Sequence, residues 1–108
     1  AIMMQMAHLH EVQGEPNKAI VLYEKVIADG VRAYGREIVS QAYTGLGEQL
    51  FSKGQFRKSL AAFESANRLA EPHRRGYLQW RIGWCHLNLG SQPKATQTLV
   101  RVLKNPEM

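Results

Sequence analysis

The side chains in this sequence that could bind a metal ion or catalyse a reaction are few and scattered. His8 and His10 lie two positions apart, which places them roughly 200° apart around a helix, so we do not expect them to share a metal ion. His8 and Glu11 could contact one ion, but two ligands are fewer than a metal site requires. Cys85 and His86 are adjacent rather than spaced as a Cys-x-x-Cys motif. We therefore expect no metal, no cofactor and no enzyme active site.

Two other motifs could bind an anion. Gly45-Leu46-Gly47 lacks the third glycine, the preceding strand and the acidic partner of a dinucleotide-binding fingerprint. Arg74 and Arg75 follow Pro72, where a helix is expected to begin, and free backbone amides beside guanidinium groups favour an anion. The default interpretation is that both arginines are solvated. Arg74 and Arg75 are thus a candidate anion site, and the sequence contains no phosphate-binding loop.

The most informative segment is residues 73–89, HRRGYLQWRIGWCHLNL, because as a helix it has two apolar sides. At about 100° per residue, one side consists of Leu78, Ile82, Cys85 and Leu89. The nearly opposite side consists of Tyr77, Trp80, Trp84 and Leu87. This second side either packs against a neighbouring helix or offers its rings to a partner, as Trp and Tyr do at interaction hot spots. Both interpretations stay open and can hold for different rings.

The helix that carries these rings belongs to a helix-turn-helix unit that is clearest in residues 42–66, AYTGLGEQLFSKGQFRKSLAAFESA. Gly47 allows a second helix to approach the first closely, and Gly54 ends the first helix, since glycine best tolerates a positive φ. Phe56, Leu60 and Phe63 then recur at the 3–4 residue spacing of one helical face. The pattern predicts two antiparallel helices.

The same order of residues recurs on both sides, around turn glycines Gly14, Gly54 and Gly90, which are 40 and 36 residues apart. Downstream the matching residues are Ile82, Gly83, Ala95, Leu99 and Val102, and upstream they are Met6, Ala7, Ala19, Tyr23 and Val26. We predict one array, residues 1–108, with units at approximately 1–30, which is incomplete, 40–73 and 76–108. The extra residues fall at 30–36 and 72–76, where 31–36 forms either an extra turn or a short linker.

The central unit resembles a tetratricopeptide repeat (TPR). In that family a large residue, a Leu-Gly pair, another large residue, a turn glycine, a small residue, an aromatic residue and a second small residue follow at fixed offsets. Those slots hold Tyr43, Leu46-Gly47, Leu50, Gly54, Ser59, Phe63 and Ala66. Only Ser59 departs from the pattern, where the family usually has alanine. The resemblance implies an all-α, right-handed α-solenoid of antiparallel helix pairs, a superhelix of about six helices. It implies a scaffold that binds a partner peptide or helix in its concave groove.

The resemblance also implies which residues line that groove. They are Tyr77, Trp80, Trp84 and Leu87 of the third unit, Thr44, Glu48 and Phe51 of the second, and Met4 and His8 of the first. Some TPR domains grip a C-terminal carboxylate with Lys, Asn and Arg at such positions, and none of those residue types is present here, so we do not expect that clamp. Two alternatives stay open: Phe51 could fill the seam between units, and Met4 could pack in the core.

Charge bears on the choice of partner. Residues 1–50 carry four basic and six acidic side chains, a net charge of −2, whereas residues 51–108 carry ten and three, a net charge of +7. The basic half is either solvated surface or a site for an acidic peptide or a neighbouring acidic repeat. A polyanion such as RNA is a further alternative that the pattern disfavours, because aromatics and phosphate-spaced cations would have to share one groove. Its contacts would be Arg57, Lys58, Arg68, Arg74, Arg75 and Arg81.

Composition adds weaker expectations. With 108 residues, 44% hydrophobic and 21% charged, the chain fits one ordinary globular domain, and it has no apolar run of the roughly 18 residues that a membrane span needs. The single Cys85 favours a reducing compartment such as the cytoplasm. The abrupt start at Ala1 suggests a piece of a longer array. Its terminal helices could then associate with a second copy through Leu99, Val102 and Leu103.

Overall fold

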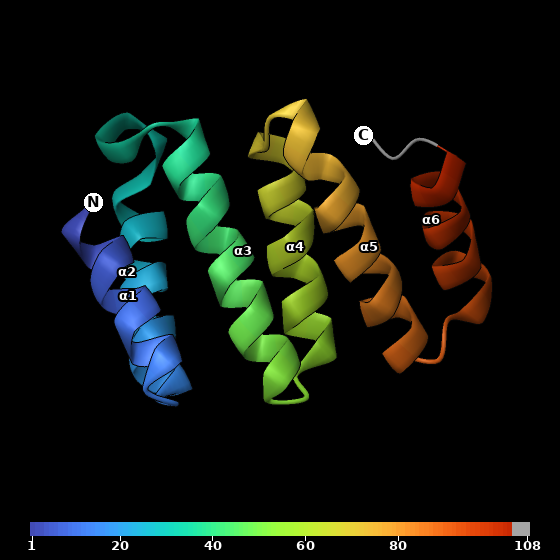
Figure 1. Cartoon of the computed structure of the whole chain (residues 1–108), viewed down its shortest axis with the longest axis horizontal. Helices are drawn as coiled ribbons and strands as arrows, with labels where there is room; N and C mark the ends of the chain where they lie inside the picture. Colours follow the sequence, from blue (N-terminus) through green and yellow to red (C-terminus); the bar gives the residue numbers. More distant parts are fainter. Residues whose placement is uncertain (105–108) are drawn as a thin grey trace.

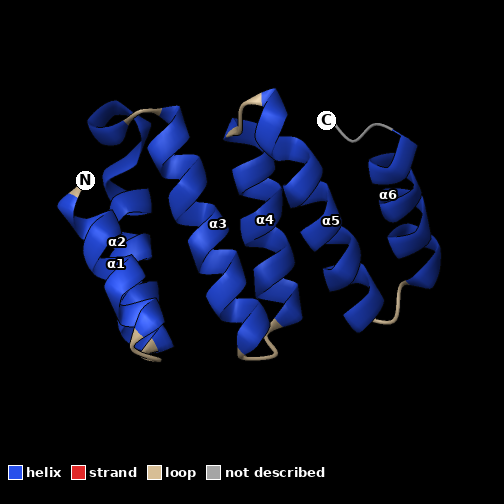
Figure 2. Cartoon of the chain, viewed as in Figure 1, coloured by secondary structure: helices blue, strands red, loops and turns tan. Residues whose placement is uncertain are grey.

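The computed structural model describes residues 1–104, which form six α-helices with no strand among them (Figures 1 and 2). The helices are α1 (Ile2–Val12), α2 (Pro16–Tyr34), α3 (Arg36–Ser52), α4 (Phe56–Leu69), α5 (Pro72–Asn88) and α6 (Gln92–Lys104). The predicted all-α class and the predicted number of helices are confirmed. The last four residues of the third predicted unit, 105–108, lie outside the described part of the chain.

Each helix packs against the helix before it and the helix after it in the sequence. Figure 1 shows α3, α4, α5 and α6 following one another along the longest axis, with α1 lying against α2 at the other end. The molecule measures 38 × 27 × 20 Å along its principal axes. Because the connections are short, successive helices run in opposite directions, and odd-numbered and even-numbered helices lie towards different sides.

The turn glycine of the central unit has the backbone conformation that the sequence predicts. Gly54 follows α3 with φ at +76°, and the next amide, that of Gln55, donates a hydrogen bond to the carbonyl oxygen of Leu50 at 2.9 Å. The region around Gly54 is open, so the positive φ rather than crowding is what requires glycine there.

Helix α2 is interrupted at Gly30, where φ is +85° and ψ is −178°. Residues 31–34 then form one further helical turn before Gly35. The sequence predicts either an extra turn or a short linker at residues 31–36, and the structure shows an extra helical turn at 31–34. This turn accounts for the longer spacing between the first two turn glycines.

Two buried clusters form the core, one on each side of α3. The first contains Met4, Ala7, Ala19, Tyr23, Val26 and Ala42, and the second contains Phe63, Ala66, Ala70, Leu78, Ile82 and Cys85. Small residues let the helices approach closely: a Cβ atom on Gly47 would lie 2.9 Å from the Phe63 ring, and one on Gly83 would lie 2.7 Å from Leu99. The predicted role of Gly47 in close packing is confirmed.

The structure corrects the orientation of α1. The repeat pattern predicts Met6 on the packing side of this helix, and for Met4 it predicts either a position in the groove or one in the core. Met4 is in fact only 6% exposed and belongs to the first core cluster, whereas Met6, Ile2 and Leu9 are exposed. The physical reason is that α1 packs on α2 through Met4 and Ala7, in the cluster that also includes Ala42 of α3, and no described helix covers its other apolar side.

Candidate binding surface

Four large side chains form a continuous exposed row along α5, and we call this row the aromatic strip. Tyr77, Trp80, Trp84 and Leu87 are 44%, 42%, 37% and 36% exposed. The ring centroids of Tyr77 and Trp80 lie 6.2 Å apart, and Trp80 contacts Trp84 edge to face at the same centroid distance. The opposite side of α5 is buried in the second core cluster. Of the two interpretations drawn from the sequence, the exposures favour rings that are free to contact a partner.

One end of the aromatic strip is fixed by a hydrogen bond between helices. The phenol of Tyr77 donates to the carboxylate of Glu48 on α3. Partial burial, together with this carboxylate, raises the pKa of Tyr77 to about 12. The Tyr77 ring is therefore oriented rather than freely rotating, which lowers the entropy cost of using it in an interface.

Arg81 lies beside the aromatic strip, with its guanidinium packed on rings. The guanidinium carbon is 4.4 Å from the centroid of Phe51, 5.3 Å from that of Phe63 and 5.9 Å from that of Trp80. Phe51 is partly buried, packs against the second core cluster, and contacts Phe56 edge to face at 5.0 Å. Phe51 thus fills the seam between α3, α4 and α5, the alternative that the sequence left open for it.

The candidate anion site at Arg74 and Arg75 is corrected by the structure. The Arg74 guanidinium donates from one nitrogen to Glu37 at 3.1 Å and to the Ser40 hydroxyl at 2.9 Å, and from the other to the Thr44 hydroxyl at 2.9 Å. Three of its five N–H donors are occupied within the chain because α5 begins beside the first half of α3. Arg75 is exposed and donates to the carbonyl of Ala70 at 3.3 Å, so the two arginines do not converge on one site.

A shallow hollow of about 180 Å³ lies between α1, α3 and α5, which shows that these three helices share one surface. We call that surface the odd-helix face. The hollow is lined by His8, Gln41, Thr44, Gly45, Glu48 and Arg74. Thr44 is only 8% exposed, since its hydroxyl donates to Ser40 and accepts from Arg74. Of the predicted groove residues, His8 is exposed, Thr44 lines the hollow but is largely buried, and Met4 packs in the core, which is the alternative that stayed open for it.

Sequence reasoning missed the contacts that the buried Tyr23 of α2 makes with α1 and α3. Its ring passes over Gly45, where a Cβ atom would lie 2.3 Å from a ring carbon. Its hydroxyl donates to Glu11 and lies 3.3 Å from Nδ1 of His8. Burial and the Glu11 carboxylate both raise the pKa of the Tyr23 phenol well above its ordinary value. The signal was present as a glycine at position 45, opposite one of the two tyrosines of α2.

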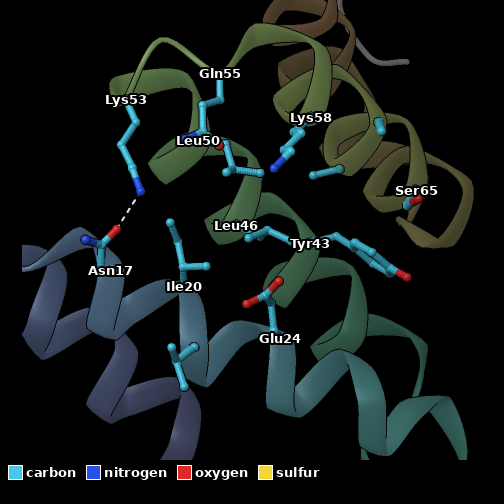
Figure 3. A pocket seen from close by; sticks show the side chains of 13 residues that line it. Asn17, Ile20, Glu24, Tyr43, Leu46, Leu50, Lys53, Gln55, Lys58 and Ser65 are labelled. Carbon is cyan, nitrogen blue, oxygen red and sulfur yellow. Dashed lines mark hydrogen bonds between the residues drawn. The ribbon is translucent and has the colours of Figure 1, made fainter.

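A larger hollow lies on the opposite side, between α2 and α4 with α3 as its floor, and we call it the even-helix groove (Figure 3). Its volume is about 610 Å³. Figure 3 shows Ile20 of α2 facing Leu46 and Leu50 of α3, while Lys53 donates a hydrogen bond to Asn17 at one end. No sequence pattern pointed to this groove, because its floor residues were assigned to packing inside the repeat.

The equivalent hollow one unit later differs in chemistry. It lies between α4 and α6 over α5, has a volume of about 300 Å³, and is lined by polar residues that include Glu64, His86 and Arg101. Thirty-six residues separate Leu50 from His86, the spacing of the last two units. The aliphatic floor formed by Leu46 and Leu50 between α2 and α4 is therefore not repeated between α4 and α6.

Within residues 1–104, no three His, Cys, Asp or Glu side chains are grouped so that they could hold a metal ion. In the same part of the chain, no helix combines the length and the apolar character that crossing a membrane requires. The arrangement offers rings, hydroxyls and charges for non-covalent contacts.

Comparison with known proteins adds no further assignment. No protein-family model matches the chain, and no curated protein matches it.

Proposed function

We propose that the chain is a TPR-like helical-repeat module, a right-handed superhelix that binds a segment of another protein along the odd-helix face. The observation that carries the proposal is the aromatic strip. Four large apolar side chains, each more than a third exposed, form one row on a helix whose other side is already buried. Exposed apolar rows of this kind are typical of interaction sites, and Trp and Tyr are the residues that most often dominate binding energy.

Magnitudes favour the aromatic strip over the surface charges. A Trp side chain presents up to about 250 Å² of surface, so covering the exposed two fifths of Trp80 or Trp84 yields roughly 2 kcal/mol per ring. A solvent-exposed ion pair contributes about 0–1 kcal/mol. The rings therefore supply most of the affinity available on this face, and nearby charges set orientation and selectivity.

The length of the aromatic strip sets the size of the ligand. From Tyr77 to Leu87 the helix rises about 15 Å, at roughly 1.5 Å per residue. About five residues of an extended peptide, or three turns of a helix, cover that distance. A bound segment of five to eleven residues is therefore sufficient.

The experiment is a selection of random twelve-residue peptides, displayed on phage, against the immobilised chain. Recovered peptides are then tested on the Trp84→Ala variant. The proposal expects peptides rich in aromatic or aliphatic residues whose binding is lost on Trp84→Ala. Peptides that bind both proteins equally, or failure to recover any specific peptide, would contradict it.

A second candidate, self-association, is supported by exposed apolar side chains on the terminal helices. Leu103 on α6 is 82% exposed, and Ile2 on α1 is 75% exposed. Leu99 does not contribute, since it packs against Gly83, and Val102 is half-buried. Light scattering over a range of protein concentrations separates the two candidates, because a peptide-binding monomer keeps one molar mass.

Binding of a polyanion such as RNA has less support than peptide binding or self-association. Arg74 is occupied by Glu37, Ser40 and Thr44, and Arg81 packs on aromatic rings. Two of the six basic residues named for such a contact are thus held in place within the chain.

A further inference from the structure

Arg81 differs from Arg74, the other arginine held between α5 and α3, in what neutralises its charge. Arg74 forms an ion pair with Glu37 at 3.1 Å. Arg81 forms no ion pair with any carboxylate among residues 1–104, and its contacts are the faces of Phe51, Phe63 and Trp80. A guanidinium is thus held against three rings without a counter-charge.

The hydrogen-bond donors of Arg81 are also unused. Its Nε is buried and has no acceptor within the described part of the chain. The other two guanidinium nitrogens donate no hydrogen bond to an acceptor in residues 1–104 either. Cation–π packing on Phe51 orients the planar group, so that little side-chain entropy remains to be lost when an acceptor arrives.

We propose that Arg81 is a carboxylate receptor within the candidate surface, and that the segment bound there carries an aspartate or glutamate side chain next to its apolar anchor. This inference rests on the proposed function, since Trp80 and Trp84 supply the site for the anchor. Because Nε is buried, the two terminal nitrogens of the planar guanidinium are the ones that match a carboxylate with two parallel hydrogen bonds. The acid sets which apolar segments are accepted.

The charges around Arg81 favour a carboxylate over a phosphate group. Glu48 lies on the same face and accepts a hydrogen bond from Tyr77. The charge of Glu48 raises the pKa of Tyr77 and the charge of Arg81 lowers it, so both charges lie near this phenol. A phosphate would bring close to two negative charges to one cation beside a carboxylate. With Arg81 and Glu48 already offsetting each other, a single carboxylate adds one negative charge to this face, about half of what a phosphate adds.

The test starts from the peptides selected on the wild-type chain. They are expected to contain Asp or Glu at a fixed spacing from an aromatic or aliphatic residue. The dissociation constant of one such peptide, and of its version with the acid replaced by the amide, is then measured on wild type and on Arg81→Gln. Arg81→Gln alone, or the amide peptide alone, is expected to weaken binding about tenfold or more. The amide peptide is expected to bind Arg81→Gln only slightly more weakly still, because both changes remove the same contact.

Arg57→Gln is the matched control, since Arg57 is exposed on α4 and the same unit charge is lost. It is expected to change the dissociation constant by less than about twofold. If Arg81→Gln does not fold, Arg81→Lys replaces it, because lysine keeps the charge and loses the planar fork. That variant is expected to bind the acidic peptide about fivefold more weakly and the amide version unchanged.

The inference is overturned if the selected peptides lack acidic residues, if Arg81→Gln binds as wild type does, or if phosphoserine in place of the acid binds more tightly. When Trp84→Ala still abolishes binding in those cases, the proposed function stands and only the role of Arg81 fails. When Trp84→Ala has no effect, both fail together.

Discussion

The phenol of Tyr77 on α5 donates a hydrogen bond to the carboxylate of Glu48 on α3. This contact joins two odd-numbered helices directly, in addition to their separate packing on α4. It also places the first ring of the aromatic strip against Trp80. The odd-helix face is therefore a connected surface, in which a change on α3 reaches the rings of α5.

Ionisation of Tyr77 should report this contact. Because its pKa is raised from 10 to about 12, the folded chain keeps a proton that the unfolded chain loses in that interval. The contribution of Tyr77 to stability is thus complete below pH 10 and is lost as the pH rises towards 12. Absorbance at 295 nm, compared between wild type and Tyr77→Phe, should show one ionisation near pH 12.

Glu48→Gln is the companion variant for this titration. It removes the carboxylate, so the pKa of Tyr77 should fall towards 10. A wild-type ionisation of Tyr77 already at pH 10 would mean that the hydrogen bond is not formed in solution.

Arg74→Ala should destabilise the fold by about 1–2 kcal/mol, because Glu37, Ser40 and Thr44 each lose a donor. Arg75→Ala is the matched control, since Arg75 carries the same charge one position later and is exposed. Its effect should stay within about 0.5 kcal/mol. The urea concentration at the unfolding midpoint is compared between the two variants. Equal midpoints would contradict the bridging role of Arg74.

Ser59→Ala should destabilise the fold by about 1 kcal/mol. The buried Ser59 hydroxyl donates to the carbonyl of Gly47 at 2.7 Å and accepts from the thiol of Cys85 at 3.6 Å. Losing these bonds outweighs the gain of roughly 0.5 kcal/mol in helix propensity. The repeat pattern alone predicts a neutral or stabilising change, because alanine is usual in this slot. Thermal unfolding of Ser59→Ala distinguishes these two expectations. An unchanged or raised midpoint would contradict the role of the Ser59 hydrogen bonds and favour the prediction from the repeat pattern.

Gly45→Ala should cost about 3 kcal/mol or more, although alanine is ordinarily the better helix former. The new methyl group would meet the Tyr23 ring, which is buried and bonded to Glu11. Gly83→Ala is a milder comparison, since its methyl group meets the flexible end of Leu99. If Gly45→Ala melted at or above the temperature of Gly83→Ala, the path of Tyr23 across α3 would be wrong.

Much of the fold could be predicted because local chemistry decides it. A turn glycine such as Gly54 and the small residue Gly47 each have one structural use, and their spacing sets helix lengths and packing. The two sides of α5 followed from the helical period, and Leu78 is buried where Trp84 is not. These features can be predicted without knowing which helices contact one another.

The rest depended on contacts between residues far apart in the sequence. Arg74 was assigned to solvent or to an anion, because nothing local shows that Glu37 lies beside it. Met4 and Met6 are the same residue type on the same helix, and only the position of α2 decides which of them is buried. The even-helix groove was missed for the same reason, since it exists only where α2 and α4 leave α3 uncovered.

The dissociation constant of a selected peptide for Trp84→Ala, set against Val21→Ala, tests the central claim most directly. Val21 is 65% exposed and lines the even-helix groove, so the two variants truncate apolar side chains on opposite surfaces. We expect Trp84→Ala to weaken binding by about 2 kcal/mol, roughly thirtyfold, and Val21→Ala to leave it within twofold. Unchanged affinity for Trp84→Ala, with a large loss for Val21→Ala, would place the binding site in the even-helix groove and contradict the role of the aromatic strip.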